Sequence, residues 1–175
     1  MIKNALVVLL AMFMIFGCES TEDEKDPVAY SFTSGNIKTG PAEYFSFATN
    51  GSDTLGTSSW DVKFTSVLVT PGPGAPTIAH PYFEGSADLG FARVDAASLA
   101  DVVDVPGSFS TGIFTTVGFE DTWYTSTDAH ITEPLDYVYV VNTADGKYPA
   151  FEVTNYYDAE GESGTYTLSW KYLSE

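Results

Sequence analysis

Cysteine is almost absent from this sequence, since Cys18 is the only one among 175 residues. Disulfides within the chain are therefore excluded, and the fold must be stabilised by its core alone. Common enzyme motifs are missing as well: the chain has no Gly-x-Ser-x-Gly elbow, no His-Glu-x-x-His motif and no glycine-rich phosphate loop at a strand–helix junction. Acid pairs such as Glu120-Asp121 are expected by chance among 24 acidic residues. We expect a protein that is not an enzyme.

Basic residues are also scarce. Seven Lys and Arg stand against 24 Asp and Glu, which gives a formal net charge of −17 at pH 7. Nucleic acid is excluded as a partner, because contacts to phosphates need clustered Lys and Arg. Anionic lipid headgroups would repel the chain, so the protein surface is not expected to hold a membrane by itself.

The start of the chain has the features of an export signal. Lys3 precedes an apolar run from Ala5 to Phe16, which is too short to span a bilayer but has the length of the apolar region of a signal peptide. The run ends in Ile-Phe-Gly-Cys, which resembles a bacterial lipobox. We expect residues 1–17 to be a lipoprotein signal peptide and Cys18 to be lipidated, so that the lipid is the membrane anchor. A plain secretory signal ending near a cysteine is the alternative.

Residues 18–27 follow as an acidic segment. Positions 19–26 hold five acids and one lysine, with no aromatic or aliphatic side chain. Such a stretch cannot bury enough apolar surface to offset the entropy of ordering it, so we expect a flexible tether. It resembles the acidic signal of surface-exposed lipoproteins in Bacteroidetes-type bacteria, which predicts an outer-membrane lipoprotein at the cell surface. A solvated spacer without a sorting role is the alternative.

Residues 28–175 are predicted to form one all-β domain, an antiparallel meander or sandwich. Apolar and polar residues alternate in 59–69 and again in 165–173, which is typical of half-buried strands. Further strands are predicted at 113–119, 137–141 and 150–157. Asp145-Gly146 lies between the last two and predicts a hairpin with a type I′ turn, because glycine accepts a positive φ.

Two segments depart from the strand pattern. Residues 94–104 favour one short helix of two or three turns, with Asp95 as its N-cap. Residues 70–81 contain four prolines and two glycines, which predicts a stiff loop.

The two histidines, His80 and His130, are the most informative polar residues. A neutral imidazole is the commonest protein ligand of transition metals and of haem iron. Both are predicted on loops, from which two imidazoles could approach an iron from opposite sides. Nearby aromatic side chains could pack against a flat macrocycle: Tyr82, Phe83, Trp123 and Tyr124. Two alternatives remain open, namely ordinary surface histidines and a zinc site with acidic ligands such as Asp128 or Glu133.

The second half of the chain resembles the HmuY family of bacterial haem-binding lipoproteins. The resemblance extends over about Tyr44 to Tyr172 and is strongest after Trp123, with a further Trp-Asp strand at 58–64. The matching elements are Trp123-Tyr124, the turn with His130, Thr143 to Tyr148, Tyr156-Tyr157 and Gly164 to Thr167.

This resemblance implies an all-β fold that binds haem, serves an outer-membrane haem receptor and holds the iron by two axial ligands. These ligands are histidines in some members and methionines in others. Methionine is excluded here, because Met1, Met12 and Met14 all lie in the signal peptide. His130 falls on the family's turn, and His80 is assigned as the second axial ligand because it is the only other histidine. The alternative is a non-haem interaction module of the same fold that binds a glycan or a protein.

Overall fold

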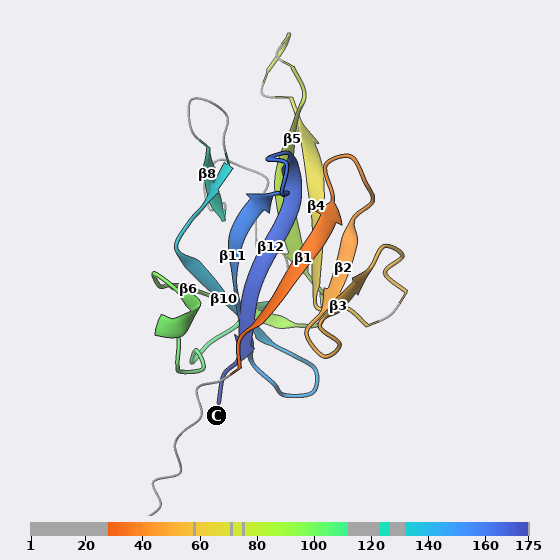
Figure 1. Ribbon diagram of the computed structural model, residues 1–175. Coiled ribbons are helices and arrows are strands. Elements are labelled where there is room, and N and C mark those ends of the chain that lie inside the picture. Colours follow the sequence, from red (N-terminus) through yellow and green to blue (C-terminus); the bar gives the residue numbers. More distant parts are fainter. Residues whose placement is uncertain are drawn as a thin grey trace, which may run out of the picture.

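The computed structural model describes residues 28–57, 59–70, 72–74, 76–111, 123–126 and 132–174. Within these residues the chain is folded into antiparallel sheets, as Figure 1 shows. The larger sheet has six strands in the order β1 (Tyr30–Asn36), β12 (Ser163–Tyr172), β11 (Pro149–Tyr157), β10 (Tyr137–Asn142), β6 (Gly90–Asp95) and β7 (Ser110–Thr111).

A second sheet of four described strands faces it. Its order is β3 (Gly51–Asp53), β2 (Glu43–Ser46), β4 (Val62–Val69) and β5 (Ile78–Gly85). A separate pair consists of β8 (Tyr124–Ser126) and β9 (Thr132–Pro134). Every described pairing is antiparallel. The prediction of a single all-β domain is therefore confirmed, while the predicted strand at 113–119 lies outside the described residues.

The main core lies between the two sheets and is largely aromatic. Alternation in the sequence places Phe64 of β4 and Tyr166 of β12 on the facing sides, where both are fully buried and their ring centroids are 4.9 Å apart. Phe83 of β5 meets Phe151 of β11 at 5.8 Å in the same way. Buried aromatic surface of this extent replaces the disulfides that the chain lacks.

Strand β10 is buried on both faces, which explains its nearly uninterrupted apolar sequence. Tyr139 and Val141 belong to the main core, whereas Val138 and Val140 pack in a second cluster with Leu99 and other residues outside the sandwich. The 3₁₀ helix η1 (Leu99–Asp101) supplies part of this outer cover.

The predicted helix over 94–104 is wrong in length. Residues up to Asp95 continue β6 and pair with β10, so only the three residues of η1 remain helical. Asp95 is not the N-cap, since Ser98 occupies that position and its hydroxyl contacts the Asp101 carboxylate at 2.8 Å. Strand pairing with β10 has overridden the local helix propensity.

The predicted loop over 70–81 is shorter than expected, because the β4–β5 hairpin is regular up to the pair Val69–Ile78. His80 and Pro81 therefore lie on a strand. β5 is the last strand of its sheet in the described order, and an edge position tolerates a proline whose missing N–H would have pointed away from the ladder.

The hairpin at Asp145-Gly146 is confirmed, but its turn is not type I′. Gly146 has a φ of 75°, whereas Asn50 is the only described non-glycine residue with a positive φ. The N–H of Gly146 donates to the carbonyl of Thr143 at 3.0 Å, and that of Thr143 to the carbonyl of Lys147 at 3.0 Å. The loop is therefore a longer turn closed by one left-handed glycine. No helix of the described chain has the length and apolar character needed to cross a bilayer.

Candidate functional site

His80 is the described member of the histidine pair, and it lies near the tip of the β4–β5 hairpin. Its cross-strand partner is Val67. The ring is half-buried, and its Nδ1 atom lies 2.8 Å from the hydroxyl of Tyr124. The Nε2 atom is buried from solvent. Because Nδ1 faces the Tyr124 hydroxyl, Nε2 is the ring nitrogen through which a metal could be bound; a histidine metal ligand usually donates the N–H of its other nitrogen to a partner.

Tyr124 approaches His80 from the first position of β8. Only 9% of the residue is exposed, and burial raises the pKa of its hydroxyl above the ordinary value of 10.0. A burial cost of this sign disfavours the phenolate, so the hydroxyl keeps its proton at neutral pH. Sequence reasoning identified Tyr124 as an aromatic neighbour and missed this hydrogen bond, because β5 and β8 are distant in sequence.

The β8–β9 hairpin carries both Tyr124 and the segment that contains His130. Ser126 of β8 pairs with Thr132 of β9, and residues 127–131 join these two positions. His130 and Asp128 lie outside the described residues. The hairpin is attached to the large sheet because the N–H of Thr132 donates to the hydroxyl of Tyr157 on β11 at 2.7 Å.

The aromatic residues near the histidines do not form an exposed platform for a macrocycle. Phe83 and Trp123 belong to the main core and have ring centroids 6.3 Å apart, and Tyr82 is buried too. These rings pack in the core of the ligand-free chain and leave little free surface for a flat ligand. Any ligand at His80 meets the edge of this core.

A buried group of polar atoms lies beside the His80–Tyr124 pair. Trp123, Tyr156 and Tyr166 contact one another, with ring centroids 5.1 to 5.8 Å apart. Burial raises the pKa of both the Tyr156 and the Tyr166 hydroxyl well above the ordinary value. The alternation of β12 predicted that Tyr166 points inward, but a sequence cannot show that these three rings pack together in the core.

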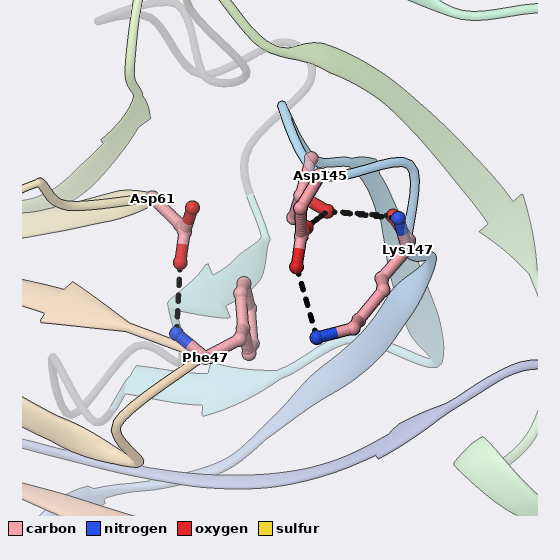
Figure 2. Close-up of polar contacts among 5 residues, drawn as sticks. Phe47, Asp61, Asp145 and Lys147 are labelled. Atoms are coloured by element: carbon pink, nitrogen blue, oxygen red, sulfur yellow. Dashed lines mark hydrogen bonds and ion pairs between the residues drawn. The ribbon is translucent and has the colours of Figure 1, made fainter.

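Another polar cluster closes the sandwich near the β10–β11 turn (Figure 2). One carboxylate oxygen of Asp61 accepts the backbone N–H of Phe47 at 2.8 Å. Asp145 accepts the hydroxyl of Thr143 at 2.6 Å and pairs with the ammonium group of Lys147 at 2.9 Å. Burial raises the pKa of Asp61, whereas the bond from Thr143, aided by Lys147, lowers the pKa of Asp145. The bond of Asp61 joins two loops, whereas the contacts of Asp145 lie within one turn; both carboxylates are engaged.

Two cations of the described chain are already engaged. Lys63, on the strand paired with β5, lies 2.6 Å from the carboxylate of Glu84. Arg93 lies over the ring of Tyr137, 4.4 Å from its centroid. Among the described residues no group of three or more His, Cys, Asp or Glu could hold a metal ion, and this includes Glu133. The zinc alternative therefore gains no support from the described part.

No protein-family model matches the chain, and no curated protein matches it in sequence. Solved structures do share its fold. A protein of Bacteroides fragilis named as a lipoprotein has a TM-score of 0.61 at 14% identity, over 87% of this chain and 93% of its own. A protein of Bacteroides vulgatus named as an HmuY-like haem-binding protein has a TM-score of 0.59 at 16% identity, over 84% and 93%.

A third similar structure is the apo form of an HmuY analogue from Tannerella forsythia. Its TM-score is 0.56 at 14% identity, over 88% of this chain and all of that one (100%). The resemblance to the HmuY family is thereby confirmed at the level of the fold. At such identities function must be argued from the site.

Proposed function

We propose that this chain is a lipoprotein of the HmuY fold that binds haem for iron acquisition and catalyses no reaction. Cys18 is its lipid anchor after removal of residues 1–17, and 18–27 is the tether that holds residues 28–175 at the outer surface of the outer membrane. His80 and His130 are the axial ligands. An outer-membrane receptor is the partner that takes up the haem.

One observation carries this proposal: the hydroxyl of Tyr124 lies 2.8 Å from Nδ1 of His80, and Tyr124 belongs to the strand pair that flanks residues 127–131, and so His130, in the sequence. Tyr124 and Ser126 are two positions apart on β8, which corresponds to roughly 7 Å along a strand. The pairing of β8 with β9 therefore holds Ser126 and Thr132, the described residues that flank 127–131 in the sequence, on the strand pair that contacts His80. Together with a fold shared with HmuY-like proteins, this supports the proposal that His80 and His130 act as a pair.

The donor set fits haem. Bound haem would supply an iron that accepts two axial nitrogen ligands. His80 offers an imidazole whose ring orientation is fixed by Tyr124 and whose Nε2 is shielded from water. Neutral aromatic surroundings favour an apolar macrocycle over a hydrated ion. Lys63 is already paired with Glu84, so the propionates are expected to face solvent.

A haemin titration of residues 19–175 tests the proposal, with visible spectra recorded in both oxidation states. The wild-type chain should saturate at one haemin per chain with low-spin, six-coordinate bands. His80→Ala and His130→Ala should each lose these bands. Ile78→Ala is the matched control, because Ile78 is on β5 two positions from His80 and shares its face. Wild-type spectra in both histidine variants would contradict the proposed ligands.

A second candidate function is an interaction module that binds a glycan or a protein. It is favoured by the stretch from Phe64 to Phe83, which contains no charged residue in a chain of net charge −17. Leu68 is 72% exposed and Ile78 is 41% exposed on this hairpin. Binding on a glycan array that is lost in Leu68→Ser, in a chain that leaves haemin spectra unchanged, would favour this candidate.

A further inference from the structure

The contact between His80 and Tyr124 raises the question of which ring nitrogen carries the proton. A neutral imidazole has one N–H and one unprotonated nitrogen, and a hydrogen bond at one nitrogen fixes the state of the other. Nδ1 of His80 is 2.8 Å from the Tyr124 hydroxyl. A phenol is the stronger donor and an imidazole nitrogen the stronger acceptor, so the favoured bond runs from the hydroxyl to Nδ1.

The burial of the pair strengthens this preference. Tyr124 is 9% exposed and Nε2 of His80 is buried, so bulk water competes poorly for either group. In such surroundings a hydrogen bond of the wrong polarity is costly. When Nδ1 of the neutral ring is unprotonated, the proton is on Nε2. A metal that binds through Nε2 needs the lone pair of that nitrogen, so the proton must first leave it.

We propose that Tyr124 is a positioning residue that holds ligand-free His80 in the tautomer protonated on Nε2. Coordination through Nε2 then requires this hydrogen bond to reverse. The proton leaves Nε2, Nδ1 takes up a proton through solvent, and Nδ1–H donates to the phenol oxygen, while Tyr124 keeps its own proton and turns it away. The chain's net proton count does not change. The proposal has two halves: the tautomer of the ligand-free chain is the first, and the reversal on coordination is the second. Only the second half rests on the proposed haem binding.

The tautomer can be observed without any ligand. The chain has only two histidines, so long-range ¹H–¹⁵N spectra of histidine-labelled protein contain two ring systems, and His130→Ala assigns them. We expect wild-type His80 to show unprotonated Nδ1 and protonated Nε2. In Tyr124→Phe the two nitrogens should shift toward a mixture of both tautomers. Tyr82→Phe is the control, because the Tyr82 hydroxyl contacts Glu84 at 3.2 Å. Protonated Nδ1 in the wild type, or unmoved signals in Tyr124→Phe, would overturn the proposal.

Haemin kinetics test the reversal. In Tyr124→Phe the hydrogen bond is lost from both the free and the haem-bound state. The transition state between them, in which this bond is already broken, loses nothing. Association and dissociation should each become roughly threefold to tenfold faster, with Kd changed by less than about twofold, as expected for a hydrogen bond of ordinary net strength. Unchanged rates would overturn the second half. A wild-type chain that binds no haemin would overturn it together with the proposed function, while the tautomer spectra still decide the first half.

Discussion

At the scale of single residues, two neighbouring tyrosines of β11 have hydroxyls in opposite situations. Tyr156 is 2% exposed, and its hydroxyl is buried with no hydrogen-bond partner in the described part of the chain. The hydroxyl of Tyr157 accepts the N–H of Thr132 and attaches the β8–β9 hairpin. A buried unpaired hydroxyl lowers the free energy of unfolding, whereas a hydrogen-bonded one raises it. The two side chains are therefore a matched pair for measuring this difference.

Tyr156→Phe should leave the free energy of unfolding unchanged or raise it by up to about 1 kcal/mol, because it removes a buried polar atom and keeps the ring contacts. Tyr157→Phe should lower the same quantity by about 1 kcal/mol, because the N–H of Thr132 loses its acceptor. Urea unfolding followed by tryptophan fluorescence measures both. If Tyr156→Phe were as destabilising as Tyr157→Phe, the Tyr156 hydroxyl must have a partner in the folded protein.

The candidate site shows where prediction from the sequence ends. The scarcity of histidine was enough to choose His80 as a candidate ligand, because a residue type that occurs only twice is a candidate for a specific role. Its partner Tyr124 was not predictable, since the contact depends on how β8 lies against β5. The same limit applies to Trp123: its position in the sequence predicts an aromatic beside a loop, and only the packing of three strands makes it part of the core.

At the scale of elements, the turn between β10 and β11 depends on one glycine. Gly146 has a φ of 75°, and a Cβ built there would meet no atom within 4 Å. Its substitution therefore changes backbone preference without creating a clash. Gly107 also has open space around a Cβ but has no positive φ, which makes it a matched control.

Gly146→Ala should lower the free energy of unfolding by about 1 kcal/mol, because an L-residue in the left-handed region pays a steric cost that glycine avoids. Gly107→Ala should be neutral or slightly stabilising, since alanine has less backbone freedom to lose on folding. Thermal unfolding of both variants under identical conditions measures the difference. Equal effects would mean that the hairpin relaxes into another turn type.

Strands were predictable wherever the chain alternates or stays apolar between turn residues. β10, β11 and β12 were predicted to within a few residues for that reason. β5 was missed, because Pro81 and the prolines just before the strand argue against regular structure unless the strand is known to lie at an edge. The helix at 94–104 was overestimated, because the pairing of Asp95 with Tyr137 on β10 is a long-range contact that local propensity does not contain.

At the scale of the whole molecule, the candidate site lies at the end of the domain opposite to the start of β1. β1 begins beside the C-terminal end of β12, with Tyr30 opposite Trp170. In Figure 1 this end lies at the bottom, whereas the tip of the β4–β5 hairpin and the β8–β9 pair lie toward the top. With the proposed anchor at Cys18, the end with His80 would be opposite to the end at which the tether joins the domain, where a receptor or free haem can reach it.

The large negative charge predicts an unusual salt response of the folded domain. Residues 19–175 contain six Lys and Arg against 24 Asp and Glu, a net charge of −18, so repulsion within the compact state opposes folding, and the unfolded chain relieves it by expanding. Raising the ionic strength from 0.01 M to 1 M shortens the screening length from about 30 Å to about 3 Å. The melting temperature of residues 19–175 should therefore rise with sodium chloride at pH 7.

A control at the isoelectric point separates charge repulsion from other effects of salt. The calculated isoelectric point is about 4.1, and near this pH the net charge that salt would screen has disappeared. The rise in melting temperature should shrink or vanish there, because only local ion pairs such as Lys63–Glu84 remain to be screened. An equal rise in melting temperature at both pH values would assign the stabilisation to exclusion of salt from the protein surface. Charge repulsion would then have no measurable effect on the stability that the aromatic core provides.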